Sequence, residues 1–379
     1  MATFCSALWL TFALPLTYGG VSLFVVAFAV YPIAASLFRA SATPKRLIPG
    51  TIALGAFTFT MTALPGTPAI QNAIPMPYFG TTLFAAPGLG LIAGALMFCL
   101  GGYWLHRRAT AAIAAGEQYQ TKTTGFDDVA HELEGPPSSA PRNGSGPPPF
   151  IGFLPILIVL IGNYMIVTFV IPRVQTDYLA TSPYGATTIG SVAGIWSIIA
   201  ALVLACCVLV LLNRRRFVSL KDALVEGANS AVLPIVNTAS LVGFGTVIAS
   251  LSGFLDIRDA ILGVFPENPL VSLAIAVNAL AGITGSASGG MSIALKTLGD
   301  TYLEIGNAAD ISPDLLHRVT SISTGGLDAL PHNGAVVTLL SICGLTHKEA
   351  YIDIFVVAVL FPLIALCVVI ILGSAFGSF

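Results

Sequence analysis

Long apolar runs separated by short polar stretches make up most of this 379-residue chain. A membrane-spanning helix needs about 20 mainly apolar residues. Five runs approach or exceed that length, at residues 79–105, 150–171, 188–212, 228–251 and 351–372. Two further runs, residues 47–73 and 315–343, are equally long but carry glycine, proline and polar residues at their centres. The pattern predicts a helical membrane protein that contains two broken transmembrane helices.

The break in residues 315–343 reads G-G-L-D-A-L-P-H-N-G. Pro331 lacks a backbone N–H and disfavours a helical residue before it. Unwound backbone at membrane depth is tolerated only where it lines a cavity or is buried in protein. Ionisable side chains at that depth are functional candidates, so Asp328 and His332 mark half of a predicted site. The alternative is a loop between two shorter helices, with both side chains in water.

A second copy of this arrangement lies in the first part of the chain. The sequence A-L-P-G around Pro65 matches A-L-P-H around Pro331. Upstream, T-Y-G-G-V-S in one copy and I-T-G-S-A-S-G-G-M-S in the other form a second polar break. The spacing from Tyr18 to Pro65 equals that from Gly285 to Pro331 to within one position. Paired interrupted segments of this kind indicate the binding site of a transporter.

Short apolar arms flank both upstream breaks and predict re-entrant hairpins, the second over residues 270–298. For the first hairpin, the alternative is one full span through residues 21–38. Five predicted crossings separate the two hairpins, so the second copy is expected to be inverted. The predicted fold is an all-α polytopic membrane protein, an inverted repeat with two re-entrant hairpins and two broken transmembrane helices. The hairpin tips and the breaks are expected to meet near the midplane.

Composition and charge agree with this class. The chain is 55% hydrophobic and 9% charged, with a mean hydropathy of +0.88 and a net charge of -2, which excludes a soluble globular protein. There is no basic patch, so no nucleic-acid partner is expected. The six cysteines lack metal-site spacing, and we expect no metal or cofactor. Motifs of metalloproteases, serine hydrolases and P-loop enzymes are absent from the sequence, so no enzyme is expected; a channel stays an alternative.

Three segments organise the chain. Residues 1–105 form the first repeat, residues 106–149 a linker rich in proline, glycine and serine, and residues 150–379 the second repeat. The alternative for residues 109–119 is an extension of the preceding helix. Threading the spans places most of the 16 Lys and Arg residues on one side, which the positive-inside rule assigns to the cytoplasm. The linker is then a flexible cytoplasmic segment and the C-terminus is outside. The four exceptions are Arg173, Arg258, Lys296 and Arg318.

The motifs L-T-Y-G-G-V-S, T-A-L-P-G-T-P-A-I-Q-N, G-S-A-S-G-G-M and G-G-L-D-A-L-P-H-N-G resemble those of the gluconate permease family of bacterial proton symporters, within the ion-transporter superfamily. The resemblance implies import of gluconate or a related hydroxy-monocarboxylate with protons across the bacterial inner membrane. It also implies a homodimer with a scaffold domain and a moving transport domain. Family members carry an extra N-terminal membrane region, so the first repeat is predicted to be N-terminally truncated. Sodium coupling is the alternative.

The predicted site combines half-helix N-termini, which favour anions, with hydroxyl and glycine residues. The substrate-binding candidates are Thr17, Tyr18, Gly19, Gly20, Ser22, Thr62, Gly66 and Thr67 in the first half, and Thr284, Gly285, Ser286, Ser288, Gly289 and Asn333 in the second. A carboxyl group at low dielectric favours its neutral form, and histidine titrates near neutrality. Asp328 and His332 are therefore the proton-coupling candidates. The first copy has Thr62 and Gly66 in their places.

Overall fold

The computed structural model of the chain describes residues 17–18, 23–119, 149–181, 183, 189–214 and 268–379, together with scattered residues between 217 and 260. The described residues form helices joined by turns, with no strand among them. Three of the described helices are long and apolar enough to cross a membrane: Pro87–Ala114, Ile195–Asn213 and His347–Phe376. The prediction of a helical membrane protein is therefore confirmed.

The first broken helix lies where the sequence pattern predicts it. The first half comprises α2 (Leu23–Ala40), η1 (Lys45–Leu47), α3 (Ile48–Ala56), α4 (Phe59–Thr62), α5 (Ile70–Ala73) and α6 (Met76–Phe79). Between α3 and α4, the hydroxyl of Thr58 donates to the carbonyl of Leu54 at 2.6 Å, a side-chain bond that competes with helix continuation. The break after α4 contains Pro65 and Gly66, and Gly66 has a left-handed φ of +81°. A residue with a side chain is strained at that angle.

The long helix that follows is displaced from its predicted position. The predicted span was residues 79–105, whereas α7 runs over Pro87–Ala114. It starts later because Gly80 and Ala86 have left-handed φ angles and Pro87 suits the first helical turn. It ends later because its last turns are rich in alanine, the strongest helix former. The first part of the predicted linker thus belongs to α7, and residues 120–148 lie outside the described residues.

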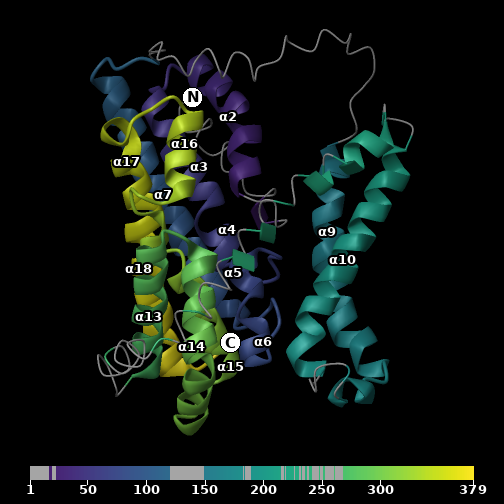
Figure 1. Cartoon of the computed structure of the whole chain (residues 1–379). Coiled ribbons are helices and arrows are strands. Elements are labelled where there is room, and N and C mark those ends of the chain that lie inside the picture. The colour runs from purple at the N-terminus through teal and green to yellow at the C-terminus, as the bar shows by residue number, and fades with distance from the viewer. Residues whose placement is uncertain are drawn as a thin grey trace.

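Two apolar helices stand beside the main body (Figure 1). They are α9 (Pro149–Met165), which continues through η2 (Ile166–Val170) and η3 (Ile171–Arg173) to η4 (Asp177–Ala180), and α10 (Ile189–Asn213). The buried amide of Asn163 donates to the hydroxyl of Ser197 at 2.9 Å and joins α9 to α10, while α10 contacts α6 of the main body. The predicted span at residues 228–251 lies mostly outside the described residues.

The second half contains a helical hairpin followed by the second broken helix. Its elements are α13 (Pro269–Thr284), α14 (Ala287–Ala308), α15 (Pro313–Ser323), η6 (Leu327–Ala329), α16 (Gly334–Ile342), α17 (His347–Phe355), η7 (Val356–Leu360) and α18 (Phe361–Phe376). The turn of the hairpin uses Gly285, whose φ is +60°. A methyl group at Gly290 would collide with the backbone of Ala281, so the two helices pack in close backbone contact. The second arm reaches Ala308, beyond the predicted end at residue 298.

The last span begins at His347, before the predicted start at residue 351. The cause is a local cap, since the backbone N–H of Thr346 donates to the carboxylate of Glu349 at 2.9 Å and thereby satisfies a free donor of the first turn. The middle of the span, η7, is a π-helical turn that packs against η6. Such turns occur frequently beside functional sites.

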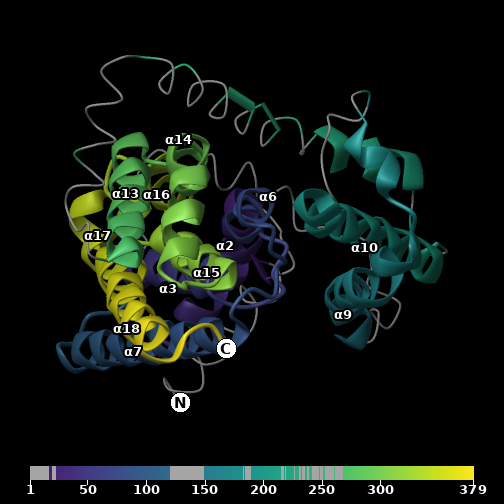
Figure 2. The same cartoon turned by 90° about the horizontal axis from the view of Figure 1, so that it is seen from below.

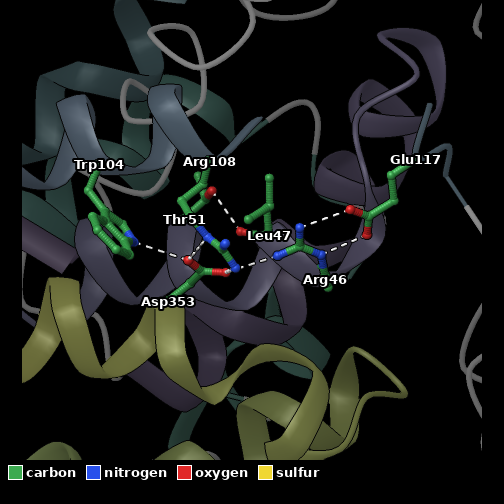
Figure 3. Close-up of polar contacts among 7 residues, drawn as sticks. All are labelled: Arg46, Leu47, Thr51, Trp104, Arg108, Glu117 and Asp353. Atoms are coloured by element: carbon green, nitrogen blue, oxygen red, sulfur yellow. Dashed lines mark hydrogen bonds and ion pairs between the residues drawn. The ribbon is translucent and has the colours of Figure 1, made fainter. Parts of the chain in front are cut away.

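Polar contacts define the two ends of the molecule. At one end, the buried carboxylate of Asp353 accepts from Trp104 at 3.0 Å and from Arg108 at 2.9 Å, and lies 3.5 Å from Arg46 (Figure 3). Arg46 also makes two hydrogen bonds to Glu117, at 2.7 and 2.9 Å. We call these five residues the ion-pair cluster. It joins the start of α3, the end of α7 and α17.

At the other end, the backbone N–H of Gly88 donates to the carbonyl of Phe379 at 2.7 Å, and Ser312 donates to Ser378 at 2.6 Å. Helix α7 therefore starts beside the C-terminus and ends at the ion-pair cluster, whereas the span His347–Phe376 runs the opposite way. Figure 2 shows α7 and α18 side by side along one flank. The breaks lie between these two ends.

Candidate functional site

The first break is held by Tyr18, at the tip of the predicted first hairpin. The hydroxyl of Tyr18 donates to the carbonyl of Pro65 at 2.7 Å, and the hydroxyl of Thr67 donates back to the carbonyl of Tyr18 at 3.1 Å. Gly66 donates to the carbonyl of Leu83 at 2.8 Å. Thr17 and Thr67 are buried. The structure thus brings these first-half candidates together, while Gly19, Gly20 and Ser22 lie outside the described residues.

The second break is held in a corresponding way by the turn of the α13–α14 hairpin. The Nε2 atom of His332 donates to the carbonyl of Gly282 at 2.8 Å. A methyl group at Gly285 would lie 3.2 Å from the His332 ring and 3.6 Å from the Cα atom of Asn333. The hydroxyl of Thr284 donates to the carbonyl of Leu280 at 2.7 Å. In each half, the hairpin residues predicted from the sequence therefore contact the break of their own half.

Two helix N-termini converge at this second break. Ser286 caps α14, because its side chain accepts from the N–H of Gly289 at 3.1 Å. Asn333 caps α16, because its side chain accepts from the N–H of Ala335 at 2.5 Å. Ser288 is partly buried and Gly289 fully buried in the first turn of α14. The positive ends of two helix dipoles therefore face one region, which favours an anion.

The two broken helices also contact each other. The hydroxyl of Ser321 on α15 donates to the carbonyl of Thr62 on α4 at 2.8 Å. A methyl group at Gly325 would lie 3.4 Å from the Thr62 methyl group, and the Thr62 hydroxyl donates to the carbonyl of Thr58 at 3.2 Å. The buried hydroxyl of Thr320 has no hydrogen-bond partner among the described residues. The end of α4 and the end of α15 thus form one polar junction at the centre of the molecule.

The structure separates the two proton-coupling candidates. Asp328 is buried, and its Oδ1 atom has no hydrogen-bond partner in the part of the chain that the structure describes. Backbone N–H groups of Asp328 and Ala329 face the carboxylate, and the Asn333 side chain donates to the Asp328 carbonyl. His332 is exposed and bonded to the hairpin. Asp328 is therefore the candidate inside the protein, and His332 lies at the surface.

Sequence reasoning missed the most deeply buried charge in this region. Arg318 on α15 has an exposed fraction of 0%. Its guanidinium donates to the carbonyl of Ala85 at 3.0 and 2.6 Å, to the carbonyl of Thr62 at 3.3 Å and to the side-chain oxygen of Asn72 at 3.2 Å. Gly90 on α7 lies next to this group, and a methyl group there would collide with the carbonyl oxygen of Ala63 and lie 3.3 Å from the Arg318 Nε atom.

Next to Arg318, the buried imidazole of His317 joins the same polar group. Its Nδ1 atom lies 2.6 Å from the Thr81 hydroxyl, and its Nε2 atom lies 3.1 Å from the side-chain oxygen of Asn72. The Asn72 amide donates to the carbonyls of Thr67 and Leu83, both at 3.0 Å. We call Asn72, Thr81, His317 and Arg318 the interior cluster. A signal existed, because a charged residue beside the polar break follows the same rule that selected Asp328.

A pocket of about 220 Å³ lies elsewhere, at the end of the molecule that carries the ion-pair cluster. Its lining residues are Pro44, Lys45, Arg46, Glu117, Gln118, Gly344, Leu345 and Glu349. None of the residues predicted from the sequence to bind substrate lines it. The pocket therefore does not belong to the junction between the two broken helices.

Comparison with known proteins gives one curated relative that is informative over most of the chain. The uncharacterized transporter YxjC of Bacillus subtilis (strain 168) is 45% identical over 353 residues, which cover 91% of this chain and 73% of the relative. No protein-family model matches the chain. No solved structure matches it either.

Proposed function

We propose, proceeding from the fact that this chain belongs to the same transporter family as YxjC of Bacillus subtilis, that it is a secondary active transporter of small organic anions. It imports gluconate or a related hydroxy-monocarboxylate together with protons, by alternating access. It works as a multi-pass protein of the bacterial inner membrane and as a homodimer in which one domain moves against the other. The coarser conclusion, a helical membrane transporter, rests on the relative and on the three apolar helices.

The observation that carries the proposal is the pair of broken helices whose breaks are held by hairpin residues of their own half. Tyr18 bonds to Pro65 in the first half, and His332 bonds to Gly282 in the second. Broken helices offer free backbone groups and dipole ends to a ligand without exposing them to lipid. This arrangement favours a transported ligand near the middle of the membrane.

The polarity of the second break supports an anion as that ligand. The N-termini of α14 and α16 converge there, beside Ser286 and Asn333. Asp328 supports the proton as the coupling ion, because it is a buried carboxyl whose Oδ1 atom has no hydrogen-bond partner among the described residues and can therefore take up a proton. An ionised Asp328 and a substrate carboxylate would repel each other, so substrate binding and protonation should assist each other.

Uptake by proteoliposomes tests the proposal. The purified wild-type protein should concentrate radiolabelled gluconate when the outside is acidic, and a protonophore should abolish the concentration. In competition with a panel of unlabelled hydroxy acids, those that carry one carboxylate should inhibit gluconate uptake, and those without a single carboxylate should not. If a sodium gradient at constant pH drives the uptake, sodium and not the proton is the coupling ion. If the protein only carries gluconate down its concentration gradient, it is not an active transporter.

Substitution of Asp328 tests the coupling step. Asp328→Asn mimics the protonated carboxyl, so it should retain exchange of internal for external gluconate. It should lose concentrative uptake by at least about tenfold, which corresponds to about 1.4 kcal/mol. Asp300→Asn on α14, where the carboxylate is exposed, is the matched control and should behave as wild type. If Asp328→Asn still concentrates gluconate with normal pH dependence, Asp328 does not carry the proton and His332 becomes the candidate.

A further inference from the structure

We propose that Arg318 supplies the positive charge that balances the substrate carboxylate, and that Arg318 and Asp328 together couple one anion to one proton by charge balance. This inference rests on the proposed function, since it assigns the counter-charge and the coupling rule of the same transport site. It begins with the only fully buried guanidinium among the described residues, that of Arg318.

The first step is that no carboxylate among the described residues forms an ion pair with Arg318. All of its hydrogen bonds go to neutral oxygens, those of Ala85, Thr62 and Asn72. Asp314, one turn earlier on α15, interacts with Arg318 electrostatically but lies beyond the ion-pair distance of 4.0 Å. The buried Asp353 provides the contrast, because two arginines lie within ion-pair distance of it. A buried charge without a contacting counter-charge is costly, so an anion that reached Arg318 would be stabilised.

The second step is the position of Arg318 in the fold. Its hydrogen bonds join the end of α4 to the turn before α7, so the charge lies directly against the first break. The same break is bound by Tyr18 through Pro65. One Nη2 hydrogen of Arg318 has no acceptor among the described residues, and guanidinium N–H groups bind carboxylates well. A ligand at the junction of the two broken helices would thus meet this positive charge.

The third step concerns Asp328, the buried acid of the same broken helix. The helices and turns packed against η6 add no competing charge, because α13 and η7 contain no titratable side chain. The nearby titratable groups are the Tyr351 hydroxyl, which donates to the Ala329 carbonyl at 3.1 Å, and the exposed His332 and His347, of which His347 lies 2.8 Å from the Pro331 carbonyl. Asp328 forms no ion pair among the described residues, so no fixed counter-charge opposes a change of its charge when the ligand binds.

The coupling rule follows from these two charges. Empty, the site holds Arg318 positive and Asp328 negative and is neutral. With one monocarboxylate and one proton, Arg318 faces the carboxylate, Asp328 is protonated, and the site is again neutral. When only the anion is bound, the site carries one net negative charge. When only the proton is bound, the site carries one net positive charge. Because a net charge inside a membrane protein is unfavourable, only the empty and the fully loaded forms should interconvert readily between the two sides.

Transport of charge is the first test. In wild-type proteoliposomes, gluconate uptake driven by a pH gradient should move no net charge, so a potential imposed with valinomycin and potassium should leave the initial rate unchanged. Uptake that accelerates severalfold with an inside-negative potential overturns the charge balance. Such a result would leave proton-driven uptake itself, and hence the proposed function, intact.

Selectivity is the second test, and it isolates Arg318. In wild type, gluconate should inhibit gluconate uptake at least tenfold more strongly than gluconamide, its neutral amide. Arg318→Gln should abolish that preference in binding and exchange, whereas Arg318→Lys should keep part of it. Lys296→Gln removes an exposed cation from α14 and should change nothing. An Arg318→Gln protein that is monodisperse in detergent and still prefers the carboxylate tenfold overturns the assignment, whether or not its transport rate changes.

Discussion

Three buried charges differ in how the fold compensates them. Asp353 is surrounded by donors from Trp104, Arg108 and Arg46 (Figure 3), which is the arrangement of a structural carboxylate. Arg318 is satisfied by neutral oxygens alone, and Asp328 retains an oxygen without a partner among the described residues. Asp353 therefore holds α3, α7 and α17 together, and the other two are the residues for which we propose a role in transport.

The outer part of the ion-pair cluster leads to a prediction about pH. The hydrogen bonds that Glu117 accepts from Arg46 lower the pKa of Glu117 below its ordinary value of 4.5. Because the folded pKa is the lower one, Glu117 stabilises the protein above pH 4.5, and that contribution disappears as the pH falls through the folded value. The thermal unfolding midpoint of wild type should therefore fall more steeply below about pH 4.5 than that of Glu117→Gln. Equal slopes for the two proteins would show that the pair is too exposed to matter.

At the level of elements, the α13–α14 hairpin depends on the absence of a side chain at one position. Gly290 packs against the backbone of Ala281, whereas Gly102 on α7 has open space around it. Glycine inside a helix normally lowers helix stability by about 1 kcal/mol relative to alanine. Gly290 is therefore explained by the contact between the two arms, which fixes where the turn meets His332.

This contact predicts opposite effects of the same substitution. Gly290→Ala should destabilise the protein by about 1–3 kcal/mol through overpacking, and should reduce gluconate exchange because the hairpin turn shifts away from the second break. Gly102→Ala should be neutral or stabilising by up to about 1 kcal/mol. Thermal unfolding in detergent and exchange in proteoliposomes measure both effects. A Gly290→Ala protein as stable and active as Gly102→Ala would contradict the close packing.

For the whole molecule, the polar ends suggest how it sits in the membrane. The ion-pair cluster gathers Arg46 and Arg108 at one end, and the C-terminus and the start of α15 lie at the other. The positive-inside rule then assigns the Arg46 end to the cytoplasm. The α13–α14 hairpin opens at the C-terminal end and reaches the second break with its turn, which agrees with entry from outside.

Labelling of single cysteines tests this orientation. In a background without the native cysteines, Ala40→Cys lies at the last residue of α2, at the Arg46 end, and Asn307→Cys lies near the end of α14; both positions are exposed. A membrane-impermeant maleimide should label Asn307→Cys in right-side-out vesicles and Ala40→Cys only after the membrane is opened. If both cysteines are labelled from the same side of the membrane, the open end of the α13–α14 hairpin and the end of α2 do not lie on opposite sides.

The sequence by itself determined the class of protein and the places where helices break. Apolar runs of membrane length need no tertiary information, and proline and glycine interrupt a helix locally, so residues 63–69 and 324–333 were predictable. The helix ends were harder to predict. Helices α7 and α14 extend past their predicted ends, because the helix propensity of alanine and packing against neighbouring helices stabilise further turns. The inverted relation of the two halves and their re-entry into the membrane stay predictions.

Only the tertiary structure decided which polar residues share an environment. Arg318 was one of four basic residues that did not fit the charge asymmetry, and nothing in its neighbours' identity shows that it contacts Thr62, Asn72 and Ala85. Asp328 and His332 looked equivalent in sequence, yet one is buried and the other exposed. The partners of Arg318 come from segments more than 200 positions away in the chain, and the charge of a buried group depends on its partners as well as on its own chemistry.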